Sequence, residues 1–138
     1  MDVAARSALM SRIRGKGNRS TEIRLIAIMR ELRVRGWRRG SQLPGRPDFV
    51  FPAQRVALFV DGCFWHGCPR HYTRPSGNAE FWERKVTQNR LRDRRVDRSL
   101  RMLGWRVVRI WEHELVKSGR GRLARRLARV VTPARRPR

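Results

Sequence analysis

A continuous apolar run at residues 56–60, VALFV, constrains the fold more than any other segment of the chain. A run that is apolar at every position is typical of a strand buried on both faces. The short run FVF at residues 49–51 precedes it, after Pro44, Gly45 and Pro47 have broken the chain. We expect the two runs to pair as a hairpin.

The segments around this hairpin indicate helices and one more strand. Ser20 and Thr21 are candidate caps of a first helix, which should end near Gly36. The apolar residues of this helix recur at the spacing of one buried face: Leu25, Ile28, Met29 and Leu32. Residues 105–111 are rich in β-forming types and predict a third strand, and the spacing of apolar residues over 123–130 predicts a final short helix.

A long helix is expected before the third strand, and Gly104 should stop it. Its apolar residues are Trp82, Val86, Val96, Leu100 and Leu103. Asn89 and Asp93 stand within this apolar stripe, so either the helix leaves the core there or the two side chains face a substrate or another site group. The neighbouring arginines favour the first alternative. The order of elements predicts an α/β domain with a small mixed sheet flanked by helices.

The length of 138 residues suits one compact domain and is too short for two ordinary ones. We expect a basic arm at residues 1–19, a single domain at residues 20–131 and a disordered basic tail at residues 132–138. No stretch approaches the roughly 18 apolar residues of a membrane span, and the N-terminal segment lacks an apolar run suited to a signal peptide. The expected location is the cytoplasm.

The charge of the chain indicates a polyanionic partner. Thirty-four Lys and Arg stand against eleven Asp and Glu, which gives a formal net charge of +23. Nucleic acid is the expected partner. An anionic membrane surface is the rival, but no amphipathic segment combines an aromatic face with a lysine face. A preference for arginine in a GC-rich genome contributes to the charge, but it does not explain the scarcity of acids.

Both cysteines of the chain, Cys63 and Cys68, lie close to histidines. With His71 they place three zinc-ligand types in one loop, and His113 completes a tetrahedral set if the third strand ends beside that loop. His66 is a fifth candidate ligand. The alternative is a pair of free buried thiols with histidines that cap or pack.

A second group of residues has the chemistry of a hydrolytic centre. Asp48 precedes the hairpin and Asp61 follows it, and a carboxylate at each edge can hold a divalent cation against a phosphate. Glu22 and His66 could reach the same place, one to orient water and one to move a proton. The alternative for Asp48 is a turn residue with no chemical role.

Phe64 and Trp65 lie between the expected zinc ligands. Large aromatic side chains in a metal-braced loop can be pushed between base pairs, and Met10 in the basic arm could act from the other groove. The alternative is that both rings cap the core under the loop.

These residues together resemble the very-short-patch repair endonucleases, the Vsr family. The resemblance covers most of residues 6–115 in the right order. The segments that carry it are RSALMSRIRGKGNRSTEIRL, SQLPGRPDFV, VDGCFWHGCPRH, EFWERKVTQNRLRDRR and LGWRVVRIWEHEL.

The resemblance implies a restriction-endonuclease-like core, a structural zinc and magnesium-dependent hydrolysis of one DNA strand. The strand would be cut on the 5′ side of the mispaired thymine in a T:G mismatch that arises when 5-methylcytosine deaminates. Implied partners are double-stranded DNA with such a mismatch, mismatch-repair proteins and a cognate cytosine-5 methyltransferase, and the family usually works as a monomer.

The resemblance also implies roles for single residues. Asp48 would be the principal magnesium ligand with the backbone carbonyl near Val60, His66 would transfer protons, and Glu22 would support the catalytic water or that histidine. The residues implied to contact DNA are Met10, Phe64, Trp65 and Asn89.

The chain departs from the family pattern at two positions. Some members carry His where this chain has Asp61, so Asp61 is expected to assist the metal instead. A cysteine is common at position 113, where His113 still offers zinc a nitrogen. Two other functions fit the residues: a restriction-type or structure-selective nuclease of the same fold, and a zinc-braced DNA-binding module without catalysis.

Overall fold

The computed structural model describes residues 20–63, 68 and 77–131. The expected arm at residues 1–19 and the expected tail at residues 132–138 lie outside the described residues. So does most of the loop that was expected to carry metal ligands and wedge residues.

A three-stranded mixed sheet forms the centre of the fold. Its strands are β1 (Phe49–Phe51), β2 (Val56–Asp61) and β3 (Arg106–Trp111), in the order β1-β2-β3. β1 and β2 are antiparallel, with Phe49 opposite Leu58, so the predicted hairpin is confirmed. β3 runs parallel to β2 from the pair Val56 and Arg106 to the pair Asp61 and Trp111. The small mixed sheet expected from the sequence is therefore present.

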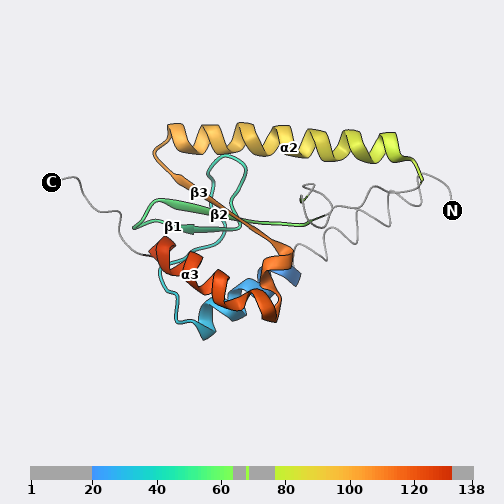
Figure 1. Ribbon diagram of the computed structural model, residues 1–138. Helices are drawn as coiled ribbons and strands as arrows, with labels where there is room; N and C mark the ends of the chain where they lie inside the picture. Colours follow the sequence, from blue (N-terminus) through green and yellow to red (C-terminus); the bar gives the residue numbers. More distant parts are fainter. Residues whose placement is uncertain (1–19, 64–67, 69–76, 132–138) are drawn as a thin grey trace.

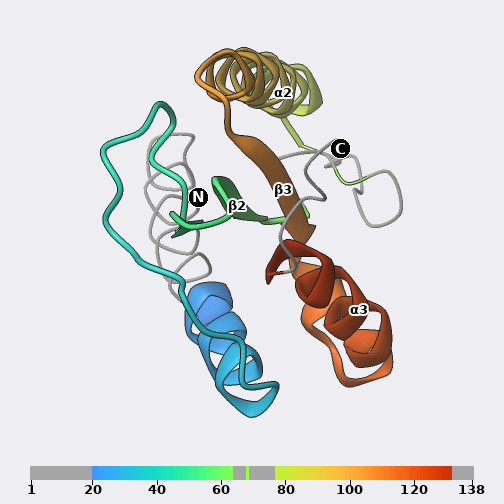
Figure 2. The ribbon, with the colours of Figure 1, turned by 90° about the vertical axis from the view of Figure 1, so that its left-hand side faces the viewer.

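Helices cover both faces of this sheet, as Figures 1 and 2 show. Helix α2 (Ala79–Met102) runs along one face, while the helix over residues 20–31, here the N-terminal helix, and α3 (Arg120–Val131) cover the other. Two short 3-10 helices, η1 (Glu112–Leu115) and η2 (Lys117–Gly119), join β3 to α3. Among the described residues, no helix is both long and apolar enough to cross a membrane.

The two layers explain why β2 is apolar at every position. Val56, Leu58 and Val60 point into the larger core, which the N-terminal helix and α3 share with one face of the sheet. Ala57 and Phe59 point the other way, into a smaller core that includes Leu100 and Val96 of α2. Successive side chains of a strand point to opposite faces of the sheet. A strand between two helical layers therefore needs apolar residues at every position.

Helix α2 and the N-terminal helix end in the same backbone motif, but only the end of α2 was predicted. Gly104, with φ of 88°, ends α2, and the Trp105 N–H donates to the Leu100 carbonyl at 3.0 Å. The N-terminal helix was expected to end near Gly36, which is wrong. It ends at residue 31, where Arg33 takes the left-handed conformation with φ of 57° and the Val34 N–H donates to the Met29 carbonyl at 2.8 Å.

Gly45 allows α2 to approach the segment that leads into β1. Its φ is +74°, and a Cβ built there would lie 2.4 Å from Cγ1 of Val96. Gly36 has a similar φ of +88°, but a Cβ there would meet nothing within 4 Å. Gly36 is therefore a matched control for backbone strain alone.

We predict that Gly45→Ala destabilises the protein more than Gly36→Ala. Strain at a positive φ costs about 1–2 kcal/mol in either variant, and overpacking against Val96 adds about 1–3 kcal/mol in Gly45→Ala only. Urea unfolding of both variants and the wild type measures the difference. An equal decrease in the free energy of unfolding of the two variants would show that α2 does not lie against Gly45.

Candidate active site and metal centre

A cavity of about 120 Å³ lies between the sheet and α2, on the face of the sheet that α2 covers. Both acidic and basic side chains line it. Its lining residues are Gly45, Arg46, Asp48, Phe59, Val60, Asp61, Arg92, Asp93, Val96 and Arg109.

Asp48 is half-buried at the start of β1, where the chain enters the sheet. Its Oδ2 accepts a hydrogen bond from the Val60 N–H at 2.8 Å, and its carboxyl group is also hydrogen-bonded to that of Glu22. Burial raises the pKa of Asp48 from 3.8 to about 7, together with the hydrogen bond to Glu22 and the negative charges of Glu22 and Asp61. The Val60 N–H acts in the opposite direction.

Glu22 reaches Asp48 from the first turns of the N-terminal helix. Arg39 forms an ion pair with its carboxylate, so Glu22 is held between a cation and a second acid. The structure therefore brings together two of the residues that the sequence analysis placed in one centre.

Two carboxyl groups in hydrogen-bond contact must share a proton or a cation, because two adjacent negative charges in a partly buried site repel each other. Carboxylate oxygens are the ligands that hard divalent cations prefer. The pair of Asp48, which lines the polar cavity, and Glu22, which reaches it, thus fits a magnesium ion in the place of the shared proton.

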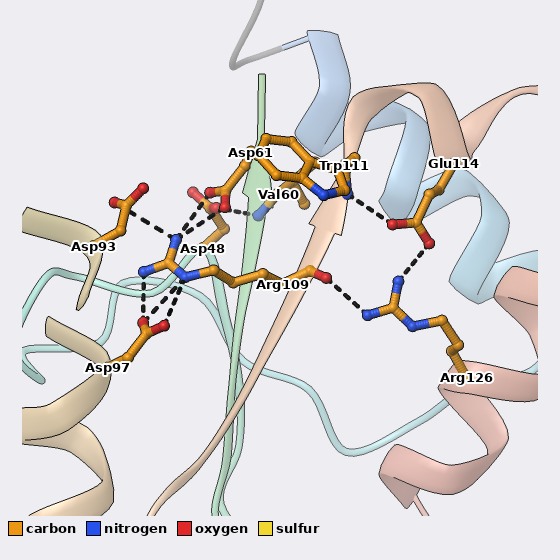
Figure 3. A network of polar contacts seen from close by, with 9 residues as sticks. All are labelled: Asp48, Val60, Asp61, Asp93, Asp97, Arg109, Trp111, Glu114 and Arg126. Carbon is orange, nitrogen blue, oxygen red and sulfur yellow. Dashed lines mark hydrogen bonds and ion pairs between the residues drawn. The ribbon is translucent and has the colours of Figure 1, made fainter. Parts of the chain in front are cut away.

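Asp61 ends β2 and is buried, with 4% of its surface exposed. Figure 3 shows its carboxylate facing the guanidinium of Arg109, whose Nη1 donates to both Asp61 oxygens at 3.0 Å. Asp61 also adds to the electrostatic field that raises the pKa of Asp48. The structure thus places Asp61 beside Asp48, in an ion pair that the sequence analysis did not include.

Arg109 binds acids on three sides (Figure 3). From α2, Asp97 accepts hydrogen bonds from its Nε at 3.0 Å and its Nη2 at 2.7 Å, and Asp93 lies 3.7 Å from Nη1. The guanidinium carbon lies 4.2 Å from the centre of the Phe59 ring. Although burial disfavours the cation, the bonds to Asp97 and the charges of the three acids raise the pKa of Arg109 above its ordinary value.

The sequence analysis missed Arg109 and Asp97. A signal existed, because an arginine stands inside the β-forming run at residues 105–111 and two aspartates stand one helical turn apart on the expected long helix. For Asp93, the alternative favoured from sequence is wrong: its side chain faces a site group and lines the cavity.

A second cluster, of cysteine and histidine, lies where the parallel strands β2 and β3 end. Its three potential ligand atoms, from Cys63, Cys68 and His113, lie within 4.8 Å of one another. His113 Nδ1 is 3.3 Å from the Cys63 sulfur and 3.5 Å from the Cys68 sulfur. Tetrahedral zinc with ordinary Zn–S and Zn–N bonds separates such atoms by roughly 3.5 Å. The donor set and its spacing therefore fit a metal ion of that kind.

The surroundings of the cluster favour a cation. The Cys63 N–H donates to the Glu112 carboxylate at 2.8 Å, and the Cys68 N–H donates to the Cys63 carbonyl at 2.9 Å, so Cys68 is held close to Cys63. Burial, the neighbouring Cys68 and the charge of Glu112 raise the pKa of the Cys63 thiol to about 12, although a hydrogen bond from the His113 backbone N–H lowers it. A bound cation would replace that proton and neutralise the site.

Several predicted site residues fall outside the described part of the chain. These are Met10, Phe64, Trp65, His66 and His71. Asn89 is described: it is half-buried on α2, but it does not belong to the cavity lining. Its contact with DNA stays a prediction, as does magnesium binding by the Val60 carbonyl.

The fold and the site define a small, strongly basic α/β protein with an acidic cavity and a cysteine–histidine cluster. The family model described as DNA mismatch endonuclease Vsr matches residues 1–72. The type II nicking enzyme V.XorIIP of Xanthomonas oryzae pv. oryzae is 38% identical over 133 residues, which cover 94% of this chain and 93% of that protein. The chain therefore belongs to the Vsr family of DNA mismatch endonucleases.

Two further relatives match about half of the chain. The type II nicking enzyme V.NaeI of Lentzea aerocolonigenes is 51% identical over 77 residues, which are 56% of this chain and 46% of that protein. The DNA mismatch endonuclease Vsr of Escherichia coli is 45% identical over 73 residues, which are 52% of this chain and 47% of that protein. This chain thus aligns with less than half the length of these two relatives.

We predict that the Asp48 carboxyl of the metal-free protein titrates at about pH 7 and that Glu22→Gln lowers its pKa. A neutral amide removes the negative charge of Glu22 and can donate a hydrogen bond to the Asp48 carboxylate. Carboxyl carbon chemical shifts, followed by NMR through a pH titration, report this pKa directly. The native state holds a proton that the unfolded state has lost, so this group makes stability fall as pH rises from 3.8 to about 7.

Glu31→Gln is the matched control for this titration. Glu31 lies on the same helix, 68% exposed, and pairs with Arg120 instead of with Asp48. The control should leave the pKa of Asp48 unchanged. An ordinary aspartate pKa for Asp48 in the wild type would remove the basis for the paired acids.

Proposed function

We propose that this protein nicks double-stranded DNA on the 5′ side of the mispaired thymine in T:G mismatches, which arise by deamination of 5-methylcytosine. The observation that carries the proposal is the Asp48 carboxyl at a polar cavity, paired with Glu22, in a chain of net charge +23. Membership of the Vsr family supports the same reaction class.

In this proposal, Asp48 is the principal magnesium ligand, and the Val60 carbonyl is a second one. When bound, magnesium neutralises charge on the scissile phosphate and makes water more acidic. The Val60 N–H holds one oxygen of Asp48 in place, so the other oxygen is oriented within the site. Glu22 orients the attacking water, and His66 transfers the proton. Asp61 assists the metal site beside Asp48, and Arg109 donates hydrogen bonds to the Asp61 carboxylate.

The basic surface supplies the affinity for DNA. Many arginines of α2 are exposed on the layer that also borders the cavity, among them Arg90, Arg94, Arg95 and Arg98. Neutralising backbone phosphates releases counterions, so binding should weaken steeply as salt rises. Arg46 and Arg92 line the cavity itself and lie where a phosphate would approach the acids.

Recognition of the mismatch is assigned to wedge residues. Met10, Phe64 and Trp65 would enter the stack beside the mismatch, and Asn89 would face the DNA. Unstacking costs a few kcal/mol per step, and a T:G wobble pair is cheaper to distort than a Watson–Crick pair. The cost of insertion can therefore select the mismatch by itself.

We propose that the cysteine–histidine cluster holds a structural zinc, with His71 as the fourth ligand beside Cys63, Cys68 and His113. The zinc would fix the loop that carries the wedge residues. We also propose that the α/β domain at residues 20–131 has a restriction-endonuclease-like core. It would work as a monomer with a cognate cytosine-5 methyltransferase and mismatch-repair proteins as functional partners.

We predict that the wild type converts a supercoiled plasmid with one T:G pair into nicked circles in the presence of magnesium, and not in EDTA. Asp48→Asn keeps the shape of the side chain but removes its charge, and it should slow nicking by roughly 10²-fold or more. Binding of the same DNA, followed by fluorescence anisotropy, should change little. Plasmid nicking by Asp48→Asn at the wild-type rate would contradict the assignment of the site.

Glu31→Gln, on the exposed face of the N-terminal helix, is the control variant and should nick normally. Matched, mismatched and branched duplexes define the substrate. Equal cleavage of T:A and T:G plasmids would indicate a restriction-type or structure-selective nuclease of the same fold. DNA binding without any cleavage would indicate a zinc-braced binding module.

We predict that Cys63→Ser loses bound zinc and lowers the unfolding temperature, because a serine hydroxyl is a poor zinc ligand. The purified wild type should contain about one zinc per chain, measured by mass spectrometry of the metal. His113→Cys is the matched control: it replaces one good zinc ligand with another and should retain the metal. A wild type that binds no zinc, or a Cys63→Ser protein that keeps it, would rule out this centre.

A further inference from the structure

We propose that Arg109 is a positioning residue of the nuclease site: it fixes the Asp61 carboxylate beside Asp48 and connects that carboxylate to helix α2. This inference rests on the proposed function, since it names a further residue on which nicking depends. Arg109 belongs to β3, and ion pairs of its side chain join the sheet to α2 (Figure 3).

The contacts of Arg109 divide between the two elements. Nη1 donates to both oxygens of Asp61 at 3.0 Å, so one nitrogen of the guanidinium holds both oxygens of this carboxylate. Nε and Nη2 donate to Asp97 on α2 at 3.0 and 2.7 Å. Only 19% of the Arg109 side chain and 5% of the Asp61 side chain are exposed, so water competes little for these bonds.

The same contacts argue against a direct role of Arg109 on the DNA phosphate. Both ends of its guanidinium are already bound to carboxylates, and its flat face lies against the Phe59 ring. A phosphate would have to displace one of these acids. Arg46 and Arg92 also line the cavity and are both exposed, so they are better placed for a phosphate.

A purely stabilising role also fails to explain the arrangement. Buried ion clusters are poor sources of stability, because the desolvation of each charge offsets most of the attraction. Apolar residues at these positions would complete the smaller core between β2, β3 and α2. The cluster instead ends at the cavity, where Asp61 and Asp93 line the wall together with Asp48. Charged residues that bind each other next to reacting groups are typical of residues that orient those groups.

The backbone of Arg109 is fixed from the opposite layer. Arg126 on α3 donates to the Arg109 carbonyl at 2.7 Å and also pairs with Glu114, whose carboxylate accepts the Trp111 N–H at 3.1 Å. β3 is therefore held to α3 by its main chain and to α2 by its Arg109 side chain. Asp61 is restrained against a strand that is itself anchored on both sides.

The test compares Arg109→Met, Arg109→Lys and a matched control, Arg106→Met, in nicking of T:G plasmid. Arg109→Met should lower kcat by roughly 10- to 100-fold, the scale expected when a site group is displaced by about 1 Å, with little change in KM. Arg109→Lys keeps the charge but cannot bind two carboxylates in the planar two-point geometry, so it should recover only part of kcat. Arg106 is exposed on the same strand and contacts the Val130 carbonyl, so its variant should leave kcat unchanged.

A double-mutant cycle with Asp61→Asn separates positioning from general structural damage. If Arg109 acts through Asp61, then Arg109→Met should lower kcat no further once Asp61 is already Asn. Should Arg109→Met alone not fold, the variant Arg109→Met with Asp97→Asn removes a cation and an acid together and restores the charge balance. The same kinetic comparison is then made in that background.

Three results would overturn the assignment. The first is a folded Arg109→Met protein with the kcat of the wild type. The second is a change in KM without a change in kcat. The third is a double variant with Asp61→Asn in which the two decreases in kcat multiply. Absence of nicking by the wild type itself is a different outcome, because it removes the proposed function and with it any positioning role. If the wild type nicks and the Arg109 variants have the same kcat as the wild type, only the positioning role is ruled out.

Discussion

The parallel pairing of β2 with β3 is the constraint on which both candidate centres depend. It places Asp61 opposite Trp111, so the residues that follow each strand meet at one edge of the sheet. Cys63 follows β2 and His113 follows β3, and they lie next to each other there although fifty residues separate them along the chain. Arg109 reaches Asp61 by the same pairing, since strands in register carry their side chains on a common face.

The parallel arrangement requires a long crossover, and α2 provides it on one face of the sheet (Figure 2). This crossover does more than return the chain, because its middle part carries Asp93 and Asp97 to the cavity. The buried residues of α2 lie on both sides of that point, at Trp82 and Val86 before it and at Leu100 after it. Val96, between the two aspartates, packs against the smaller core as well. Packing before, between and after the aspartates thus holds their side chains at the cavity.

The distribution of acids explains how a chain of net charge +23 can present a cation site. Only eleven acids are available, and four of them line the cavity or bind Arg109: Asp48, Asp61, Asp93 and Asp97. A fifth, Glu22, pairs with Asp48. A concentration of negative charge inside a basic protein separates two tasks. In the proposed function, the outer surface attracts DNA, and the acids of the cavity attract the cation that DNA cleavage requires.

The sequence by itself determined the elements and much of the chemistry, because these depend on local spacing. The apolar run of β2 predicted a strand buried on both faces, and Gly104 predicted the end of α2, since glycine is the residue that most readily takes a positive φ. The pairing of Asp48 with Glu22 and of Cys63 with His113 was also expected, from residue types that a cation can bind. The end of the N-terminal helix was not predictable in this way, because an arginine, Arg33, takes the conformation usually left to glycine.

Only the tertiary structure decided the partners of Arg109. In the sequence it is one of thirty-four basic residues, and its place inside a β-forming run does not show which acids it meets. Its partners lie 12 and 48 positions away, on a helix and a neighbouring strand that come together only through packing of the sheet against α2. A charge acquires a specific function when burial removes water and leaves particular partners within reach, and burial is a property of the whole fold.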